Sequence, residues 1–313
     1  MVIDTDAANE IDDQFAIAWA LLSRDALAVE ALHAAPFSFA HRHSATPHLS
    51  RELAPFAAPG IGMQRSAAEI RNVLRACGVD DVPVCAGTPA YLPHDGPPPA
   101  SAAVDDLIAR ALAAAPDDEP LYVLALGCPT NVSAALLLEP RIAERIVVVW
   151  TSGYPSSARQ VNRSFNLEQD LRATRVLLGC GVPLVYLPGY HVGAQLRLSW
   201  PEVERWVQAR GAIGALLADR YTHNPLWPLA GVSELFAHSW VIWDLICVAW
   251  LLCPDWVESE IVPTPRLGAD LRWQVDPAGR AMREAYAVRR DAIFRDFFVK
   301  LDQAASAASS ASA

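Results

Sequence analysis

The chain has 313 residues, a hydrophobic content of 52% and a formal net charge of −10 at pH 7. Its length is sufficient for one large α/β domain or two smaller ones. Its negative charge argues against nucleic acid and anionic membranes as partners. No apolar run reaches the length of a membrane span. Because the first expected strand begins at residue 2 and leaves no room for a signal peptide, we expect a cytoplasmic protein.

Strand-like and helical segments alternate along the chain, which predicts a mainly parallel central sheet flanked by helices, an α/β fold. The expected strands begin at residue 2 and then cover residues 28–35, 82–86, 121–126, 145–150 and 183–187. The expected helices begin with one that carries Phe15, Trp19 and Leu22 and then cover residues 66–77, 102–115, 132–138, 170–179, 200–220, 243–252 and 280–301. Residues 1–303 form a single domain in this interpretation, and the Ala/Ser tract at 304–313 is expected to be a disordered tail.

Three further features carry expectations of their own. Ser66 followed by Glu69 forms a capping box, which predicts that a helix begins at Ser66. Residues 39–62 contain three histidines and three prolines without a clear period, so they are either a lid over a site or an ordinary long insertion. The six cysteines are scattered and form no CxxC pair, which favours buried free thiols over disulfides or zinc ligands.

Polar residues follow several of the expected strands at their carboxyl ends, the edge at which ligands collect in open parallel sheets. These residues are the acidic stretch at 4–13, Phe37 and Ser38, Thr130 and Asn131, residues 151–153, and Tyr190 and His191. We therefore expect them to meet on one rim of the sheet.

Five carboxylates lie within ten residues where the first strand gives way to the first helix: Asp4, Asp6, Glu10, Asp12 and Asp13. In a buried crevice such a set stays ionised only with a cation among its members, and donors that are all oxygen favour Ca²⁺ or Mg²⁺ over zinc. The simpler alternative is that Asp12 or Asp13 caps the helix while the others are solvated. A cap needs one acid rather than five, so we favour a metal or catalytic site.

Four stretches together resemble one known family. Asp4-Thr-Asp6 followed by Asp12-Asp13 and a hydrophobic helix is similar to the N-terminal signature of the inosine–uridine-preferring nucleoside hydrolases, with two more residues between the aspartate pairs. The later stretches are residues 125–131 (ALGCPTN), 164–173 (SFNLEQDLRA) and 243–252 (WDLICVAWLL). Because the four occur in the family's order, the chain is identified as a divergent member.

The resemblance implies a Ca²⁺-dependent enzyme that hydrolyses the N-glycosidic bond of ribonucleosides or a related N-riboside, commonly as a homodimer or homotetramer. It assigns the Ca²⁺ ion to the side chains of Asp4, Asp13 and Asp244 and to the backbone carbonyl of Thr130. It assigns Asp12 as the general base that activates a water molecule. The substrate contacts that it implies are Asp6, Asn131 and Asn166.

The chain departs from the family's pattern at the leaving group. Trp243 stands where many members have a histidine acid, and Ser164 stands where they have a glutamate that contacts ribose. Protonation of the base could therefore fall to His94, His223, Tyr221 or His238, and His94 has the best case because its His-Asp-Gly turn lies near the family's loop histidine. Alternatively, Trp243 and Trp240 could stack on a purine ring.

Two other functions remain open from the sequence. A nucleoside- or sugar-binding relative without turnover is compatible with the altered residues at positions 164 and 243. An Mg²⁺-dependent phosphatase similar to the haloacid dehalogenases also places D-x-D after its first strand. That reaction needs a lysine at the phosphoryl group, and Lys300 in the terminal helix is the only lysine, so this alternative is disfavoured.

Overall fold

The computed structural model describes residues 1–40, 42, 56–113, 118–228, 230–276 and 279–311. Its main strands are β1 (Val2–Thr5), β2 (Ala31–Ala34), β3 (Val84–Ala86), β4 (Leu121–Ala125), β5 (Ile146–Ser152), β6 (Leu184–Pro188), β9 (Val257–Pro263) and β12 (Ala281–Val288). Four shorter strands form two separate antiparallel pairs, β7 (Arg197–Ser199) with β8 (Ser239–Val241) and β10 (Arg266–Leu267) with β11 (Trp273–Gln274). The α-helices are α1 (Asp12–Leu21), α2 (Pro59–Cys77), α3 (Ala102–Ala113), α4 (Thr130–Leu138), α5 (Phe165–Glu168), α6 (Leu171–Gly179), α7 (Trp200–Trp206), α8 (Gly211–Thr222), α9 (Leu245–Leu252) and α10 (Arg290–Ala311).

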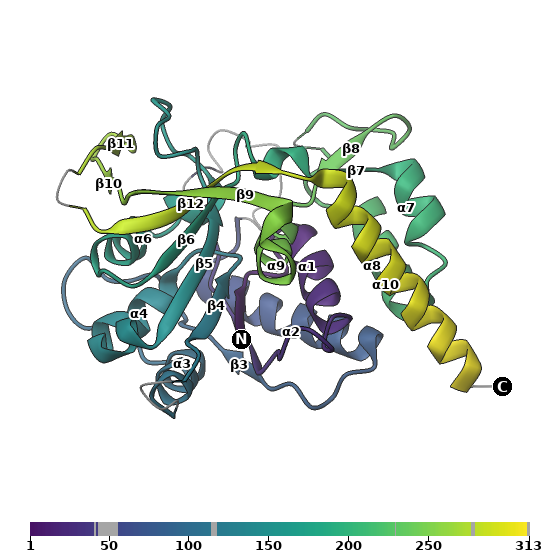
Figure 1. Cartoon of the computed structure of the whole chain (residues 1–313), viewed down its shortest axis with the longest axis horizontal. Helices are drawn as coiled ribbons and strands as arrows, with labels where there is room; N and C mark the ends of the chain where they lie inside the picture. The colour runs from purple at the N-terminus through teal and green to yellow at the C-terminus, as the bar shows by residue number, and fades with distance from the viewer. Residues whose placement is uncertain (41, 43–55, 114–117, 229, 277–278, 312–313) are drawn as a thin grey trace.

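The eight main strands form one sheet in the order β3-β2-β1-β4-β5-β6-β12-β9. Neighbouring strands run parallel, except that β9 is antiparallel to β12. Figure 1 shows helices on both faces of this sheet. The prediction of an α/β fold with a mainly parallel central sheet is thus confirmed.

The central strands are buried on both faces, which explains their nearly continuous apolar sequences. β4 reads LYVLA and β5 reads IVVVWTS, and most of their residues are buried. Successive side chains point to opposite faces: Val123 packs in the hydrophobic cluster that contains residues of α3, α4 and α6, whereas Leu124 packs in the cluster that contains α1 and α9.

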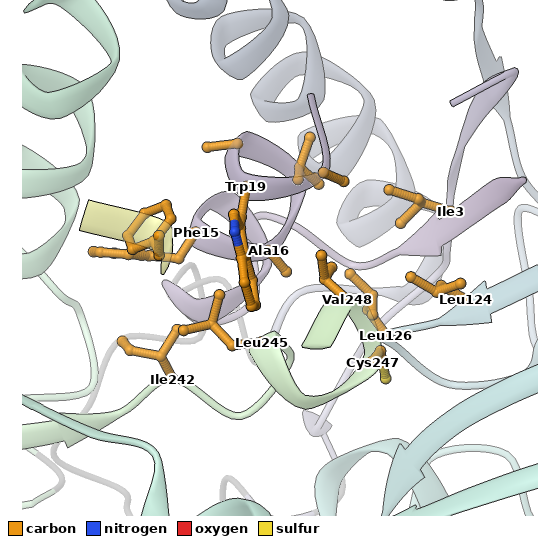
Figure 2. Close-up of a cluster of buried hydrophobic side chains, with 14 of the residues drawn as sticks. Ile3, Phe15, Ala16, Trp19, Leu124, Leu126, Ile242, Leu245, Cys247 and Val248 are labelled. Carbon is orange, nitrogen blue, oxygen red and sulfur yellow. The ribbon is translucent and has the colours of Figure 1, made fainter. Parts of the chain in front are cut away.

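The cluster on the α1 face joins the two ends of the chain. Figure 2 shows side chains of α1 lying against those of α9 and of the central strands, among them Ile3, Phe15, Ala16, Trp19, Leu124, Leu245 and Val248. Every residue of α1 is buried, and after its polar first turn the helix is apolar on all sides. The direct packing of α1 on α9 sets the amino-terminal ends of these two helices beside each other.

The helix expected over residues 280–301 is wrong in its first part. Residues 281–288 form strand β12, and α10 begins only at Arg290. Ala, Met, Arg and Glu favour a helix locally. The pairing of β12 with β6 on one side and β9 on the other overrides that preference.

The last helix extends into the Ala/Ser tract at 304–313. Helix α10 continues through Ala311, and residues 312–313 lie outside the described residues. The alanine-rich composition of this stretch favours helix extension, because alanine has the highest intrinsic helix propensity. Within the described part of the chain, none of the helices is long and apolar enough to cross a membrane.

Two helix starts differ from those expected. Helix α2 begins at Pro59, so Ser66 lies inside the helix and does not cap it. A proline in the first turn removes no intrahelical hydrogen bond, which explains the earlier start. The helix expected over 200–220 is two helices, α7 and α8. Most of the expected lid or insertion at 39–62 (residues 41 and 43–55) lies outside the described residues.

Candidate active site

A pocket opens at the carboxyl edge of the sheet, where β1, β4, β5 and β6 end. It encloses a volume of about 100 Å³. Its lining residues are Asp6, Asn9, Glu10, Asp12, Asp13, Leu126, Thr151, Ser152, Gly153, Ser164, Phe165, Asn166, Gly189, Tyr190, Trp243 and Asp244. Of the residues expected on the rim of the sheet, those that line this pocket are most of the acidic stretch, residues 151–153 and Tyr190.

Carboxylates from both ends of the chain meet in this pocket. Carboxylate oxygens of Asp12, Asp13 and Asp244 lie within 4.8 Å of one another, and all three residues are buried. Asp12 and Asp13 occupy the first turn of α1, and Asp244 is the N-cap residue of α9. The partial positive charge at helix amino termini favours anionic groups at these positions. The packing of α1 on α9 holds the two helix starts together (Figure 2).

Asp6 lines the same pocket just after the end of β1. Asn9 Nδ2 donates a hydrogen bond to Asp6 Oδ2 at 3.2 Å. Gly127, in the turn after β4, lies directly against the carboxylate, because a Cβ atom added there would be 2.8 Å from Asp6 Oδ1. A glycine at position 127 therefore leaves the space that the Asp6 side chain occupies.

Burial raises the pKa of each carboxyl group in this cluster. The pKa of Asp13 rises from 3.8 to about 6, and the pKa of Glu10 rises from 4.5 to about 7, chiefly because burial disfavours the charged form. The pKa values of Asp6, Asp12 and Asp244 are raised well above their usual range by burial and then by repulsion from neighbouring carboxylates. A divalent cation among these oxygens would lower all of these pKa values.

The groups around the pocket fit a hard divalent cation. The side chains of Asp6, Asp13 and Asp244 and the carbonyl group of Leu126 offer oxygen donors, which Ca²⁺ and Mg²⁺ prefer. Among the residues that the structure describes, no lysine, arginine or histidine lines the pocket. The side chains around the pocket therefore supply no positive charge to balance the carboxylates, and a bound metal ion would supply it.

Asp4, expected as a metal ligand, lies away from the pocket. Side chains alternate along β1, and Asp4 points toward α4, where its Oδ2 accepts a hydrogen bond from Asn131 Nδ2 at 2.7 Å. Asn131 Oδ1 in turn accepts one from the Thr88 amide at 2.8 Å. The expected substrate contact by Asn131 is therefore corrected to a contact between the sheet and α4. Asp6, two residues further along, takes the place beside the other carboxylates.

Thr130, the other expected ligand that the structure places elsewhere, is the first residue of α4. Its hydroxyl group donates a hydrogen bond to Asp170 Oδ2 at 3.0 Å. Leu126, just after β4, lines the pocket, and its carbonyl group accepts a hydrogen bond from Asn166 Nδ2. Asn166 Nδ2 also donates to the Thr151 carbonyl at 3.1 Å, so Asn166 is held in the pocket as expected for a substrate contact.

The residues considered for protonation of the leaving group do not reach the pocket. The side chain of His94 is 96% exposed and that of His223 is 77% exposed, both on the protein surface. Tyr221 is buried, but its hydroxyl group donates to the Leu198 carbonyl at 2.7 Å. These three side chains therefore lie outside the pocket. Their loops were plausible in sequence, but only the three-dimensional positions distinguish them.

Two aromatic residues and an additional acid complete the pocket. Trp243 lines it as expected, and its ring lies edge-on to Tyr190 with centroids 6.0 Å apart. Glu10, whose role the sequence left open, also lines the pocket and accepts a hydrogen bond from Trp240 Nε1 at 3.3 Å. Glu10 lies in the segment between the aspartate pairs, which is two residues longer than in the family's signature, and this extra length is the sequence feature that could have indicated an additional carboxylate.

The parallel sheet and the acidic pocket at its carboxyl edge define a class of α/β proteins that bind a small ligand at strand ends. Residues 1–292 match the family described as inosine-uridine preferring nucleoside hydrolase. The chain belongs to this family.

Comparison with individual relatives shows that the chain is divergent. The pyrimidine-specific ribonucleoside hydrolase RihB of Escherichia coli (strain K12 / DH10B) is 24% identical over 147 residues, which cover 46% of this chain and 45% of the relative. A putative RihB of Shigella boydii is also 24% identical over 147 residues, covering 46% of this chain and 58% of the relative. The chain thus spans about half the length of the curated relatives that it matches.

Solved structures resemble this chain over nearly its whole length. The purine-preferring ribonucleoside hydrolase from Gardnerella vaginalis has a TM-score of 0.70 and 20% identity, covering 97% of this chain and 98% of its own. The inosine-uridine preferring nucleoside hydrolase from Bacillus anthracis has a TM-score of 0.70 and 15% identity, covering 96% and 98%. At these identities the likeness shows a common fold.

Proposed function

We propose that the chain hydrolyses the N-glycosidic bond of a ribonucleoside or a related N-riboside, in a Ca²⁺-dependent reaction that releases the free base and ribose. The observation that carries this proposal is the meeting of Asp6, Asp12, Asp13 and Asp244 in one buried pocket beside Asn166. Membership of the nucleoside hydrolase family supports the reaction class. Relatives of this fold that are named as ribonucleoside hydrolases support it as well.

The proposed metal ligands are Asp6, Asp13 and Asp244, together with the Leu126 carbonyl group, because they line one pocket and offer only oxygen. When bound, Ca²⁺ supplies the positive charge that keeps the carboxylates ionised, and it binds a water molecule and ribose hydroxyl groups. Thr5 orients Asp13 by donating a hydrogen bond from its hydroxyl group to Oδ1.

Asp12 is the proposed general base. It lies next to Asp13 in the first turn of α1, where its carboxylate can take a proton from the attacking water. A positioned base typically contributes a factor of about 10²–10⁴ to the rate. The departing base leaves an oxocarbenium-like sugar, and the neighbouring carboxylates favour that positive charge electrostatically.

The remaining pocket residues are proposed to bind the two halves of the substrate. Asn166, fixed by its bonds to the Leu126 and Thr151 carbonyls, would contact a ribose hydroxyl group. Trp243 and Tyr190 bring aromatic rings to the same pocket and would pack against the base. Since no histidine lines the pocket among the described residues, we propose that the leaving base takes its proton from solvent.

The absence of a histidine acid from the described pocket also favours a second candidate, a relative that binds nucleosides without cleaving them. Incubation of the pure protein with Ca²⁺ and a panel of purine and pyrimidine ribonucleosides, followed by an assay for free ribose, separates the two. Ribose release that stops on chelation of Ca²⁺ supports the hydrolase. Saturable nucleoside binding without ribose release supports the binding relative instead.

We further propose that the enzyme is cytoplasmic and serves purine or pyrimidine salvage. We also propose that it assembles as a homodimer or homotetramer, because the family resemblance implies this assembly. Light scattering on the Ca²⁺-loaded protein tests the assembly. A monomeric mass at assay concentrations would contradict that part of the proposal without affecting the reaction.

A further inference from the structure

A second group of metal-ligand side chains lies outside the pocket. His33 on β2 stands in register with Cys85 on β3, so their side chains share one face of the sheet. Asp106 on α3 reaches this pair, and its Oδ2 lies 2.8 Å from His33 Nε2. None of the three lines the carboxylate pocket.

The three side chains bring together three kinds of donor atom. One imidazole nitrogen, the Cys85 sulfur and one Asp106 carboxylate oxygen lie within 4.8 Å of one another. His33 is fully buried, and its Nδ1 has no hydrogen-bond partner among the described residues. Cys85 is a free thiol that is partly exposed, and the Asp106 side chain is 23% exposed, so solvent ions can reach the group.

We propose that His33, Cys85 and Asp106 bind a divalent cation of borderline softness, Zn²⁺, with a water molecule as the fourth ligand. Imidazole, thiolate and carboxylate are the protein ligands of zinc, whereas Ca²⁺ prefers oxygen alone. The donor chemistry therefore separates this group from the carboxylate pocket. Binding releases two protons to solvent, because thiolate and neutral imidazole are the forms that coordinate a metal. One comes from the Cys85 thiol, and the other comes from His33, whose pKa is raised to about 9 because the hydrogen bond to Asp106 and the neighbouring groups outweigh the effect of burial.

The donor atoms have to move to accept the ion. Ligand bonds of about 2.0–2.3 Å in a tetrahedron separate the donor atoms by roughly 3.3–3.7 Å. The His33 and Asp106 atoms, now 2.8 Å apart, therefore have to move apart by about half an ångström. Arg110 Nε donates to Asp106 Oδ2 at 2.7 Å and would orient the ligating carboxylate.

The alternative is that His33 and Asp106 form only a buried ion pair. In that case Cys85 takes no part, and the protein has no preference for a thiophilic metal at this position. The two alternatives differ in the expected ligand set, so a spectroscopic probe of the Cys85 sulfur distinguishes them.

The test uses the full chain saturated with Ca²⁺, so that a hard cation occupies the carboxylate pocket, and adds Zn²⁺ alone or Co²⁺ alone. We expect one further equivalent of Zn²⁺ to bind, and the Co²⁺ complex to show a thiolate-to-metal charge-transfer band in the near ultraviolet. Cys85→Ser should abolish both signals. Cys180→Ser, which changes an exposed free thiol, is the matched control and should retain both.

A second variant tests whether loss of Zn²⁺ binding can be separated from loss of folding. Asp106→Asn keeps the size of the side chain and should weaken Zn²⁺ binding while circular dichroism stays near that of the parent protein. Its metal-free Tm should fall, because buried His33 loses its charged partner. A Co²⁺ complex without the charge-transfer band, or Zn²⁺ stoichiometry unchanged in Cys85→Ser, overturns the proposal. Ribose release is measured in parallel and should be unchanged in Cys85→Ser, so this test is independent of the proposed hydrolysis.

Discussion

Asp12 is the residue whose change should separate catalysis from metal binding. In Asp12→Asn the side chain keeps its size but cannot accept the proton of the attacking water, so we expect ribose release to fall by about 10²–10⁴-fold. Ca²⁺ should still bind, because the proposed ligands are unchanged. Isothermal titration with Ca²⁺ and the ribose assay check the two expectations separately. Turnover close to that of the parent protein would exclude Asp12 as the base.

Gly127 should determine the position of the Asp6 carboxylate, and through it the affinity for Ca²⁺, without touching the substrate. A Cβ atom at this position would lie 2.8 Å from Asp6 Oδ1, so Gly127→Ala must displace the carboxylate, and we expect Ca²⁺ affinity to fall by about 10–100-fold. Gly179→Ala is the matched control, because a Cβ atom there meets nothing within 4 Å at the end of α6. Its Ca²⁺ affinity should be unchanged. Equal affinities in both variants would show that Asp6 is not a ligand.

At the scale of single residues, the sequence predicted the acidic character of the site better than it predicted the individual ligands. Asp12, Asp13, Asp244, Asn166 and Trp243 all line the pocket as expected. Asp4 and Thr130 do not line the pocket. For Asp4 the motif alone does not say which face of the sheet its carboxylate takes, and Thr130 lies in the first turn of α4, where its hydroxyl group contacts Asp170.

At the scale of elements, the contact of α1 with the rest of the core should dominate stability. Phe15 is fully buried, and its ring lies 5.9 Å from that of Phe297 in α10. We expect Phe15→Ala to lower the free energy of unfolding by about 3–5 kcal/mol, measured by urea unfolding. Phe236→Ala removes a ring that is 82% exposed, and it should change that free energy by no more than about 0.5 kcal/mol.

The elements that the sequence predicted well are those with a purely local signal. β4 and β5 read as apolar runs because they are buried on both faces, and both form the centre of the sheet. β12 has a helix-forming composition, and its strand conformation depends on partners in β6 and β9 that are distant in sequence. Local propensity carries no information about such pairing.

At the scale of the whole molecule, the site depends on contacts that no local pattern contains. Asp244 reaches Asp12 and Asp13 because α9 packs on α1, and only the family resemblance predicted this meeting. The approach of Cys85 to His33 was not foreseen, because it depends on the register between β2 and β3. The scattered cysteine positions had instead favoured buried free thiols over zinc ligands.

The buried carboxylates should make the stability of the metal-free protein depend on pH in an unusual direction. Burial raises the folded-state pKa of Asp13 from 3.8 to about 6 and that of Glu10 from 4.5 to about 7. The folded protein then binds more protons than the unfolded chain between about pH 4 and pH 7, so stability falls as the pH rises through this window. Ionic pairs elsewhere, which favour higher pH, oppose this trend only at more acidic pH.

Removal of the metal should therefore cost more stability at neutral pH than at mildly acidic pH. Urea unfolding of the chelated protein at about pH 5 and about pH 7.5 should show a loss on the order of a few kcal/mol at the higher pH. Saturating Ca²⁺ should cancel that loss, because a cation among Asp6, Asp13 and Asp244 favours the ionised forms. The pH-dependent difference should shrink in Asp13→Asn, in which one of the titrating groups is absent. A chelated protein that is equally stable at both pH values would mean that the carboxylates are neutralised without a cation.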